Sequence, residues 1–379
     1  MAIQKIDIFA PPRSRYQALH YMTECLLEAF LAKGIQCRLY DSQSAEAPVD
    51  FLNNFLSDKP DLTLSFNGLL PDDQGIFFCD MVEVPHVALL VDSPPHFFPL
   101  TQSPRTLITT IDRFFVDFFQ GFGDKKALFC PHASGGKNPQ DPSSSHDLDV
   151  VMLGSFEDPE KIRKEWKHPQ DLCGVMEETA AMTLKTSDKS FVECFTLCLN
   201  KLVGLGKVDV SSLNFAEILI DIEDYVRAID RQKLIQSLAG LKVDVFGEGD
   251  WKSLAQEGLT VHPAVNFKEG LEIMGRAKVV LNSTAHIKNG SHERFFEAFV
   301  QGALPLSSPN LYLQERFQDC APFYQNSEAK EQVLEILTNE PERVKMVTQG
   351  QERVLKEDLW SNRAQILLDQ LPPLLAKLF

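Results

Sequence analysis

The chain contains 379 residues, of which 44% are hydrophobic and 24% are charged. This length and composition are typical of a globular protein with two or three domains. The formal net charge of -16 excludes a general nucleic-acid binder, which needs a basic surface, but it still allows an anionic nucleotide in a local cationic pocket.

The sequence gives no sign of a membrane segment or of secretion. No apolar run is long enough to cross a bilayer, and the N-terminus, MAIQKIDIFAPP, lacks the apolar core of a signal peptide. We therefore expect a cytoplasmic protein without an integral membrane segment. Eight scattered cysteines favour buried thiols in a reducing compartment. Cys194 and Cys198, one helical turn apart, leave a metal pair open as the alternative.

The first third of the chain alternates short apolar runs with helical stretches. Residues 16–33 have the apolar spacing of a helix, which Gly34 closes as a C-cap glycine. Such alternation predicts a parallel sheet with helices on its faces. The predicted strands are 6–9, 36–40, 62–66, 87–91, 106–110 and 126–130.

A segment rich in Gly, Pro and Ser follows, and it is the best linker candidate in the chain. A new strand begins at Asp149, and the α/β pattern resumes at Val243 after a long helical stretch. The predicted parts are an N-terminal domain (1–134), a linker (135–147), a C-terminal domain (148–345) that includes a helical block (159–240), and C-terminal helices (346–379).

Residues 241–308 carry the strongest functional pattern. A strand ends in a glycine turn at Gly247, a short helix leads to a second strand at 278–281, and a polar loop and a helix lead to a third strand at 303–306. Polar groups thus gather at the carboxyl ends of successive strands, where open α/β sheets bind ligands. The polar residues between the second and third strands include Asn282, His286, Asn289, His292 and Arg294.

The same region also carries a family resemblance. The pattern has Gly247 and Trp251 after the first strand, Asn282 after the second, and the run Gly-Ser-x-Glu-Arg-x-Phe-Glu-Ala at 290–298. It resembles the C-terminal half of CgeB-like (spore-maturation-protein-like) glycosyltransferases of the GT-B superfamily. The resemblance implies an α/β fold of two Rossmann-like α/β/α domains facing a cleft, with a C-terminal helix that crosses back to the N-terminal domain. It also implies transfer of a sugar from a nucleotide-sugar donor to an acceptor.

The resemblance suggests which residues contact the donor. Glu297 stands where GT-B enzymes hold the ribose, and a carboxylate can accept from two vicinal hydroxyls. The helix N-terminus and Arg294 suit the diphosphate. His286 and His292 can donate to a phosphate or a sugar hydroxyl, and Asn282 can contact the donor as well. A surface ion pair is the alternative for Glu297 and Arg294.

Two donor-side features leave alternatives open. Gly247 can let the backbone approach the nucleotide, but an ordinary strand-to-loop turn explains it equally well. Many retaining GT-B enzymes have two Glu separated by seven residues, and the first of these positions is Asn289 here. The sequence therefore does not decide between a retaining and an inverting course.

The N-terminal domain offers candidates for catalysis and for the acceptor. Asp92 follows an apolar strand, where a general base for an inverting transfer would stand, with His96 and His20 as alternatives. Arg13 lies where GT-B enzymes approach donor or acceptor, and Phe97 is a possible acceptor platform. The competing interpretations are a turn-forming Asp, a solvated arginine and a core phenylalanine.

We therefore predict a glycosyltransferase with an unidentified acceptor. We expect a helix N-terminus, with Arg294 or histidine, to neutralise the leaving group, so turnover should need no metal and no cofactor. A non-catalytic sugar-nucleotide or glycan-binding protein with the GT-B fold is the second hypothesis. Another GT-B chemistry, such as sugar-nucleotide epimerisation or phosphorolysis, is the third.

Overall fold

The structure is a computed structural model, and it describes residues 2–12, 14, 16–41, 48–121, 127–206, 208–325 and 328–377. The chain divides into two compact units. Unit 1 consists of Met1–Gly135 and Glu357–Phe379, and unit 2 of Gly136–Lys356. No helix of the described ranges is both long enough and apolar enough to cross a membrane.

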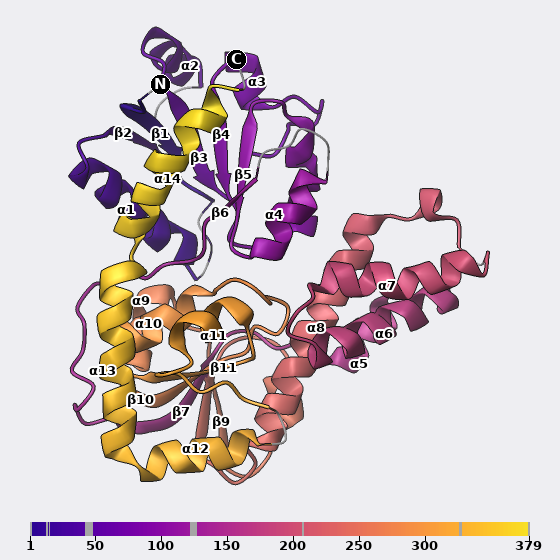
Figure 1. Cartoon of the computed structure of the whole chain (residues 1–379), viewed down its shortest axis with the longest axis vertical. Helices are drawn as coiled ribbons and strands as arrows, with labels where there is room; N and C mark the ends of the chain where they lie inside the picture. Colours follow the sequence, from indigo (N-terminus) through magenta and orange to yellow (C-terminus); the bar gives the residue numbers. More distant parts are fainter. Residues whose placement is uncertain are drawn as a thin grey trace. The chain divides into compact units, whose positions relative to one another are not determined.

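Unit 1 is built on a parallel sheet flanked by helices (Figure 1). Its described residues form six strands in the order β2-β1-β3-β4-β5-β6. Because the chain goes from β1 to β2 and then to β3 on the other side, the topological switch point lies between β1 and β3. The elements are β1 (Lys5–Phe9), α1 (Ala18–Ala32), β2 (Gln36–Tyr40), α2 (Pro48–Ser57), β3 (Leu62–Phe66), α3 (Phe78–Val82), β4 (His86–Leu89), the 3₁₀ segment η1 (Pro94–Gln102), β5 (Thr106–Thr110), α4 (Arg113–Gln120), β6 (Ala127–Phe129) and α14 (Trp360–Leu375).

The last helix, α14, packs beside α1 in unit 1 (Figure 1). Arg363 of α14 is 2% exposed, and its Nε donates to the carbonyl of Pro131 at 2.9 Å. Its Nη2 donates to the carbonyl of His132 at 2.9 Å and to Oδ1 of Asp358 at 2.7 Å. A buried guanidinium is tolerated when it is paired in this way. The C-terminal helix thus belongs to the unit that begins the chain, as the resemblance implied.

Unit 2 is a second parallel α/β unit. Its described residues form five strands in the order β11-β10-β7-β8-β9, with the switch point between β7 and β10. The elements are β7 (Leu148–Leu153), α5 (Pro159–Glu165), α6 (Gln170–Lys185), α7 (Phe191–Gly204), η2 (Val210–Ser212), α8 (Phe215–Ser237), β8 (Val243–Phe246), η3 (Trp251–Leu254), β9 (Leu259–His262), α9 (Phe267–Met274), β10 (Ala277–Asn282), α10 (Glu293–Val300), β11 (Leu304–Ser307), α11 (Leu311–Phe317), α12 (Ala329–Thr338) and α13 (Glu340–Glu357).

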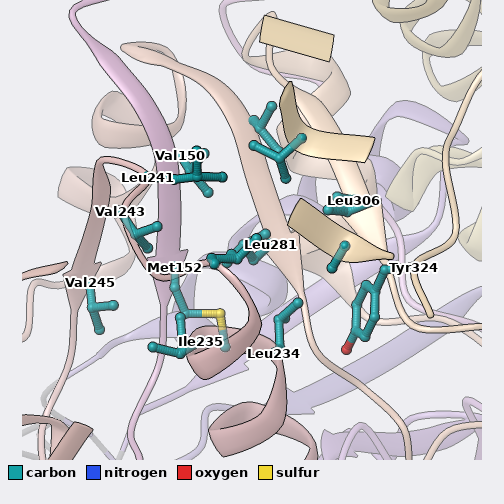
Figure 2. Close-up of a cluster of buried hydrophobic side chains, with 14 of the residues drawn as sticks. Val150, Met152, Leu234, Ile235, Leu241, Val243, Val245, Leu281, Leu306 and Tyr324 are labelled. Atoms are coloured by element: carbon teal, nitrogen blue, oxygen red, sulfur yellow. The ribbon is translucent and has the colours of Figure 1, made fainter. Parts of the chain in front are cut away.

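Helix α8 links the helical block to the sheet of unit 2. Its C-terminal part places Leu234 and Ile235 in the core cluster, with Met152 of β7 and Leu281 of β10 (Figure 2). Its earlier part packs against α6 and α7, which project from the sheet (Figure 1). The predicted helical block is therefore an insertion between β7 and β8, and α8 ties it to the core.

Helix α13 belongs to unit 2, whereas the predicted C-terminal segment starts at residue 346. A Cβ on Gly350 would lie only 2.2 Å from Cε1 of Phe299, so the helix passes directly over that ring. Gln351 Nε2 also donates to the carbonyls of Gln140 at 2.9 Å and Val300 at 3.1 Å. These contacts explain why the boundary falls at 356 rather than at 345.

Candidate functional site

The carboxyl ends of β7 and β10 meet at the switch point of unit 2. Met152 pairs with Leu281 in register, so the segments that follow, Gly154–Ser155 and Asn282–Ser283, emerge side by side. Ligands of open α/β sheets bind in the crevice at such a point. The polar loop singled out in the sequence therefore starts where a ligand is expected.

The glycine turn after β8 packs directly on the segment after β7. A Cβ on Gly247 would lie 1.8 Å from the carbonyl oxygen of Gly154, and Trp251 Nε1 donates to the same oxygen at 3.0 Å. Gly249 has φ +94°, and a Cβ there would lie 2.0 Å from the carbonyl oxygen of Phe156. Backbone packing accounts for both glycines, and an approach of Gly247 to a nucleotide stays a prediction.

Two buried arginines at the switch point have incomplete hydrogen bonding. Arg231 of α8 and Arg294 of α10 are each 8% exposed. Arg231 Nη1 donates to the carbonyl of Ser155, but Arg231 Nε and Arg294 Nη1 have no hydrogen-bond partner among the described residues. Burial, and then the positive charges of Arg227 and Arg294, lower the pKa of Arg231 to about 9. Burial also lowers the pKa of Arg294. An anion would relieve both the repulsion and the missing bonds.

The two predicted histidines differ in their surroundings. Burial, together with Arg227 and Arg231, holds the pKa of His286 well below its usual range, so this ring is neutral. Its Nε2 lies 3.8 Å from Oε1 of Glu223, and its Nδ1 has no partner among the described residues. His292 is the N-cap of α10, and its Nδ1 accepts from the backbone N–H of Arg294 at 3.4 Å. A capping role therefore accounts for His292 without a ligand.

Asn282 and Glu297 are both buried. Asn282 Nδ2 donates to Oγ of Ser307 at 2.9 Å, and its Oδ1 has no partner in the described part of the chain. Glu297 lies in α10 and is 1% exposed. Since Arg294 is buried as well, the alternative of a surface ion pair for these two residues is excluded.

Asp230 was not singled out from the sequence, although it lies next to Arg231 on α8. Its Oδ2 accepts from Oγ of Ser283 at 2.6 Å and from the hydroxyl of Tyr324 at 2.8 Å. Burial raises the pKa of Asp230. Burial, and then the negative charge of Asp230, raise the pKa of Tyr324 well above its usual range. Asp230 therefore fixes the segment after β10 to the segment that carries Tyr324.

Residues of α8 line two cavities near the switch point. The arginine cavity, of about 320 Å³, is lined by Arg231 and Arg227 of α8 and by residues after β7 and β8. The Asp230 cavity, of about 490 Å³, is lined by Asp230, the end of α6, the loop after β10 and the segment around Tyr324. The donor residues predicted from the sequence line neither of these two cavities.

The described residues contain no group of three or more His, Cys, Asp or Glu side chains placed to hold a metal ion. The Asp-x-Asp sequence of this chain, Asp147–Asp149, lies at the amino end of β7. Asp147 pairs with Arg276 at 2.5 Å and Asp149 with Lys278 at 2.7 Å. Burial raises the pKa of both Cys194 and Cys198, which favours the protonated thiol over a metal-binding thiolate.

The candidates of unit 1 fall into different environments. Asp92 is exposed just beyond β4, and its Oδ2 accepts from Nδ2 of Asn67 at 2.7 Å. His96 is also exposed, and His20 is half-buried with neither ring nitrogen bonded to a described residue. Arg13 lies outside the described residues.

The prediction for Phe97 needs a correction. Its ring is 9% exposed and belongs to a core cluster with Ile108 and Phe119. A ring held in the core cannot serve as a stacking platform for an acceptor.

Comparison with known proteins agrees with this architecture. Residues 227–369 match a family model described as glycosyl transferase-like. This span includes Asp230, Arg231 and all of the segment from β10 to α10. No curated protein matches the chain.

Solved structures of glycosyltransferases share the fold over the whole chain. AviGT4, a glycosyltransferase involved in avilamycin A biosynthesis, is 11% identical with a TM-score of 0.54, over 99% of this chain and 98% of that chain. Anabaena Alr3699/HepE, solved in complex with UDP-glucose, is 12% identical with a TM-score of 0.51, over 97% and 99% of the two chains. An α-glucosyltransferase in complex with UDP and a DNA 13-mer containing an HMU base is 7% identical with a TM-score of 0.52, over 99% and 100%.

The chain has the GT-B fold, and its residues 227–369 match the glycosyl transferase-like family. At these identities the solved structures establish the fold, and the glycosyl transferase-like domain rests on the family match. The two parallel α/β units and the return of the last helix to unit 1 agree with the sequence-based expectation.

Proposed function

We propose that this glycosyltransferase takes its sugar from a nucleoside diphosphate sugar and holds the diphosphate between Arg231 and Arg294 of unit 2. The observation that carries the proposal is the pair of buried guanidinium groups with unbonded N–H groups at the switch point. Guanidinium groups bind phosphate oxygens through two parallel hydrogen bonds, and they bind more strongly in a buried site than in water.

Neighbouring groups support the same role. The N-terminus of α10 carries the positive partial charge of the helix dipole, which favours a phosphate. The neutral His286 can donate one hydrogen bond, and Glu297 is the proposed ribose ligand. Two arginines supply the charge that a metal would otherwise bring, so we propose metal-independent turnover. We place the chain among CgeB-like enzymes on the run at 290–298, and in the cytoplasm because all eight cysteines are free thiols.

For the transfer step we propose Asp92 as the general base in unit 1, with His96 as the alternative. The carboxylate is exposed, and Asn67 fixes its position by donating to Oδ2 while its own Oδ1 accepts from the N–H of Val91. A positioned carboxylate of this kind can take the proton of an acceptor hydroxyl. The acceptor of the proposal is a protein, a glycan or a small molecule.

Calorimetric titration with UDP, GDP, dTDP and CMP, with and without EDTA, tests the donor site. We expect one nucleotide to bind the wild type equally with and without EDTA. Arg231→Gln and Arg294→Gln should each weaken that binding by about tenfold to hundredfold, because each loses charged hydrogen bonds. Arg276→Gln, at the amino edge of the same sheet, is the matched control and should bind normally. The donor site is wrong if no nucleotide binds, or if all three variants behave alike.

A further inference from the structure

The Asp230 cavity has no role in the site proposed so far. The Asp230 cavity has a volume of about 490 Å³, within the usual range for small-molecule sites. The end of α6 forms one wall, so the inserted helical block builds part of it. The lining residues are Leu184, Lys185, Thr186, Ser187, Asp230, Ala285, Lys288, Ser308, Pro309, Gln314, Phe323, Tyr324 and Gln325.

The carboxylate of Asp230 is held in place with one oxygen open. Ser283 and Tyr324 both donate to Oδ2, so within the described residues Oδ1 is left to accept from a ligand in the cavity. Tyr324 is itself fixed, because its ring packs in the core cluster with Leu306 (Figure 2). A buried carboxylate of defined orientation next to a cavity is a preorganised acceptor of hydrogen bonds.

The lining chemistry restricts the kind of ligand. Hydroxyl, amide and ammonium groups outnumber the aliphatic side chains, which disfavours an apolar ligand. A bare anion is disfavoured by the buried carboxylate. A pyranose fits, since its hydroxyls both donate and accept and its apolar face can lie against an aromatic ring such as that of Phe323.

We propose that the Asp230 cavity binds one sugar residue, with Oδ1 of Asp230 accepting from its ring hydroxyls. This inference rests on the proposed function for its biological meaning, because a glycosyltransferase handles two sugars. The sugar of the donor and a sugar of the acceptor offer the same hydroxyl chemistry. Asp230 and Arg231 are neighbours on α8 and line different cavities, so the sugar site adjoins the proposed diphosphate site.

The test compares sugar nucleotides with bare nucleotides by calorimetry. The probes are UDP-glucose, UDP-galactose, UDP-N-acetylglucosamine, GDP-mannose and dTDP-glucose, each beside its nucleoside diphosphate, and the methyl glycosides of the same sugars added to nucleotide-loaded protein. The variants are Asp230→Asn, which removes the open carboxylate, and Gln314→Trp, which fills the cavity without touching the Asp230 hydrogen bonds. Asp221→Asn is the matched control, because it changes a half-buried carboxylate of α8 that bonds His168 at 2.8 Å instead.

If the cavity holds the donor sugar, one sugar nucleotide binds the wild type more tightly than its bare nucleotide. Asp230→Asn and Gln314→Trp then weaken binding of that sugar nucleotide by about tenfold or more, and the affinity for the bare nucleotide stays unchanged. If it holds an acceptor sugar, a methyl glycoside binds the wild type and fails to bind both variants. The proposal is overturned if neither variant changes any sugar-dependent binding relative to Asp221→Asn. If no bare nucleotide binds the wild type, that result instead contradicts the proposed diphosphate site.

Discussion

Two kinds of buried arginine coexist in this protein. Arg363 donates to two backbone carbonyls and to Asp358, which satisfies its charge inside unit 1. Arg231 and Arg294 are nearly as buried, yet each has an N–H without a partner among the described residues. An unbonded buried donor costs free energy, so it is usually retained for a purpose. This contrast separates a structural arginine from those available to a ligand.

At the same scale, we predict that Gly247→Ala destabilises unit 2 by about 1–3 kcal/mol, as overpacking does. The new methyl group would collide with the carbonyl of Gly154, a backbone atom that cannot turn away. Gly174→Ala is the control, because it lies within α6 with no atom within 4 Å of its Cβ position. That change should stabilise by about 0.5–1 kcal/mol. Urea unfolding measures both, and equal effects would contradict the packing argument.

Asp92→Asn tests the base separately from the donor site. The amide can still accept from Asn67, so its position is preserved, but it cannot take a proton. We expect turnover to fall by about 10²–10⁴-fold with nucleotide affinity unchanged. Nucleotide release from the donor measures turnover, with transfer to water as the basal reaction. Asp73→Asn, an exposed carboxylate of the same unit, is the control. Normal turnover in Asp92→Asn would move the base role to His96.

At the scale of elements, local patterns predicted the strands of unit 1 well. Strands β2 and β3 have the predicted bounds, because a buried parallel strand reads as a short apolar run between turn signals. Strand β9 was missed between β8 and α9. It has four residues, is largely half-exposed and lies at the edge of the sheet, so its sequence carries little periodic signal.

The candidate site was predictable only in part, because some of its residues lie in segments without a distinctive local pattern. The polar residues between β10 and α10 marked that segment as a site, but Asp230 and Arg231 lie in the predicted helical block, where no residue was singled out. One signal was present: Asp230 stands four residues from Val226 and from Leu234, inside an apolar stripe. A carboxylate in such a stripe faces the interior. What it faces depends on the packing of α8 against distant segments, which local patterns do not contain.

The anchoring of α14 gives a prediction for an element. Arg363→Met should destabilise unit 1 by about 3–5 kcal/mol, because it removes the guanidinium that pairs with the buried carboxylate of Asp358. Adding Asp358→Asn should recover part of the loss. Lys33→Met, which removes an exposed bond from α1 to Gln365 of α14, should change stability by less than about 0.5 kcal/mol. Hydrogen exchange of α14 peptides measures all three. If the stability losses of Arg363→Met and Asp358→Asn simply add in the double variant, the buried pair is not what anchors α14.

For the whole molecule, the neutral buried histidines predict loss of stability in acid. Burial lowers the pKa of His86 to about 3. The backbone N–H of Leu69 donates to Nε2 at 3.2 Å, so the ring proton sits on Nδ1, beside Oγ1 of Thr63 at 2.9 Å. Below pH 6.5 the unfolded chain protonates this histidine and the native state does not. The free energy of unfolding therefore falls by about 1.4 kcal/mol per pH unit from this residue, between about pH 6.5 and pH 3.

His86→Gln isolates that contribution, because its amide oxygen can still accept from Leu69 without titrating. Absolute stability should drop, yet the slope against pH should become shallower than that of the wild type by about 1.4 kcal/mol per unit below pH 6. Above pH 7 the two curves should run parallel, since neither state then binds the proton. Urea unfolding at a series of pH values, followed by pulsed hydrogen exchange of β3 and β4 peptides, reports unit 1 alone. Parallel curves down to pH 4 would mean that His86 is protonated in the native state.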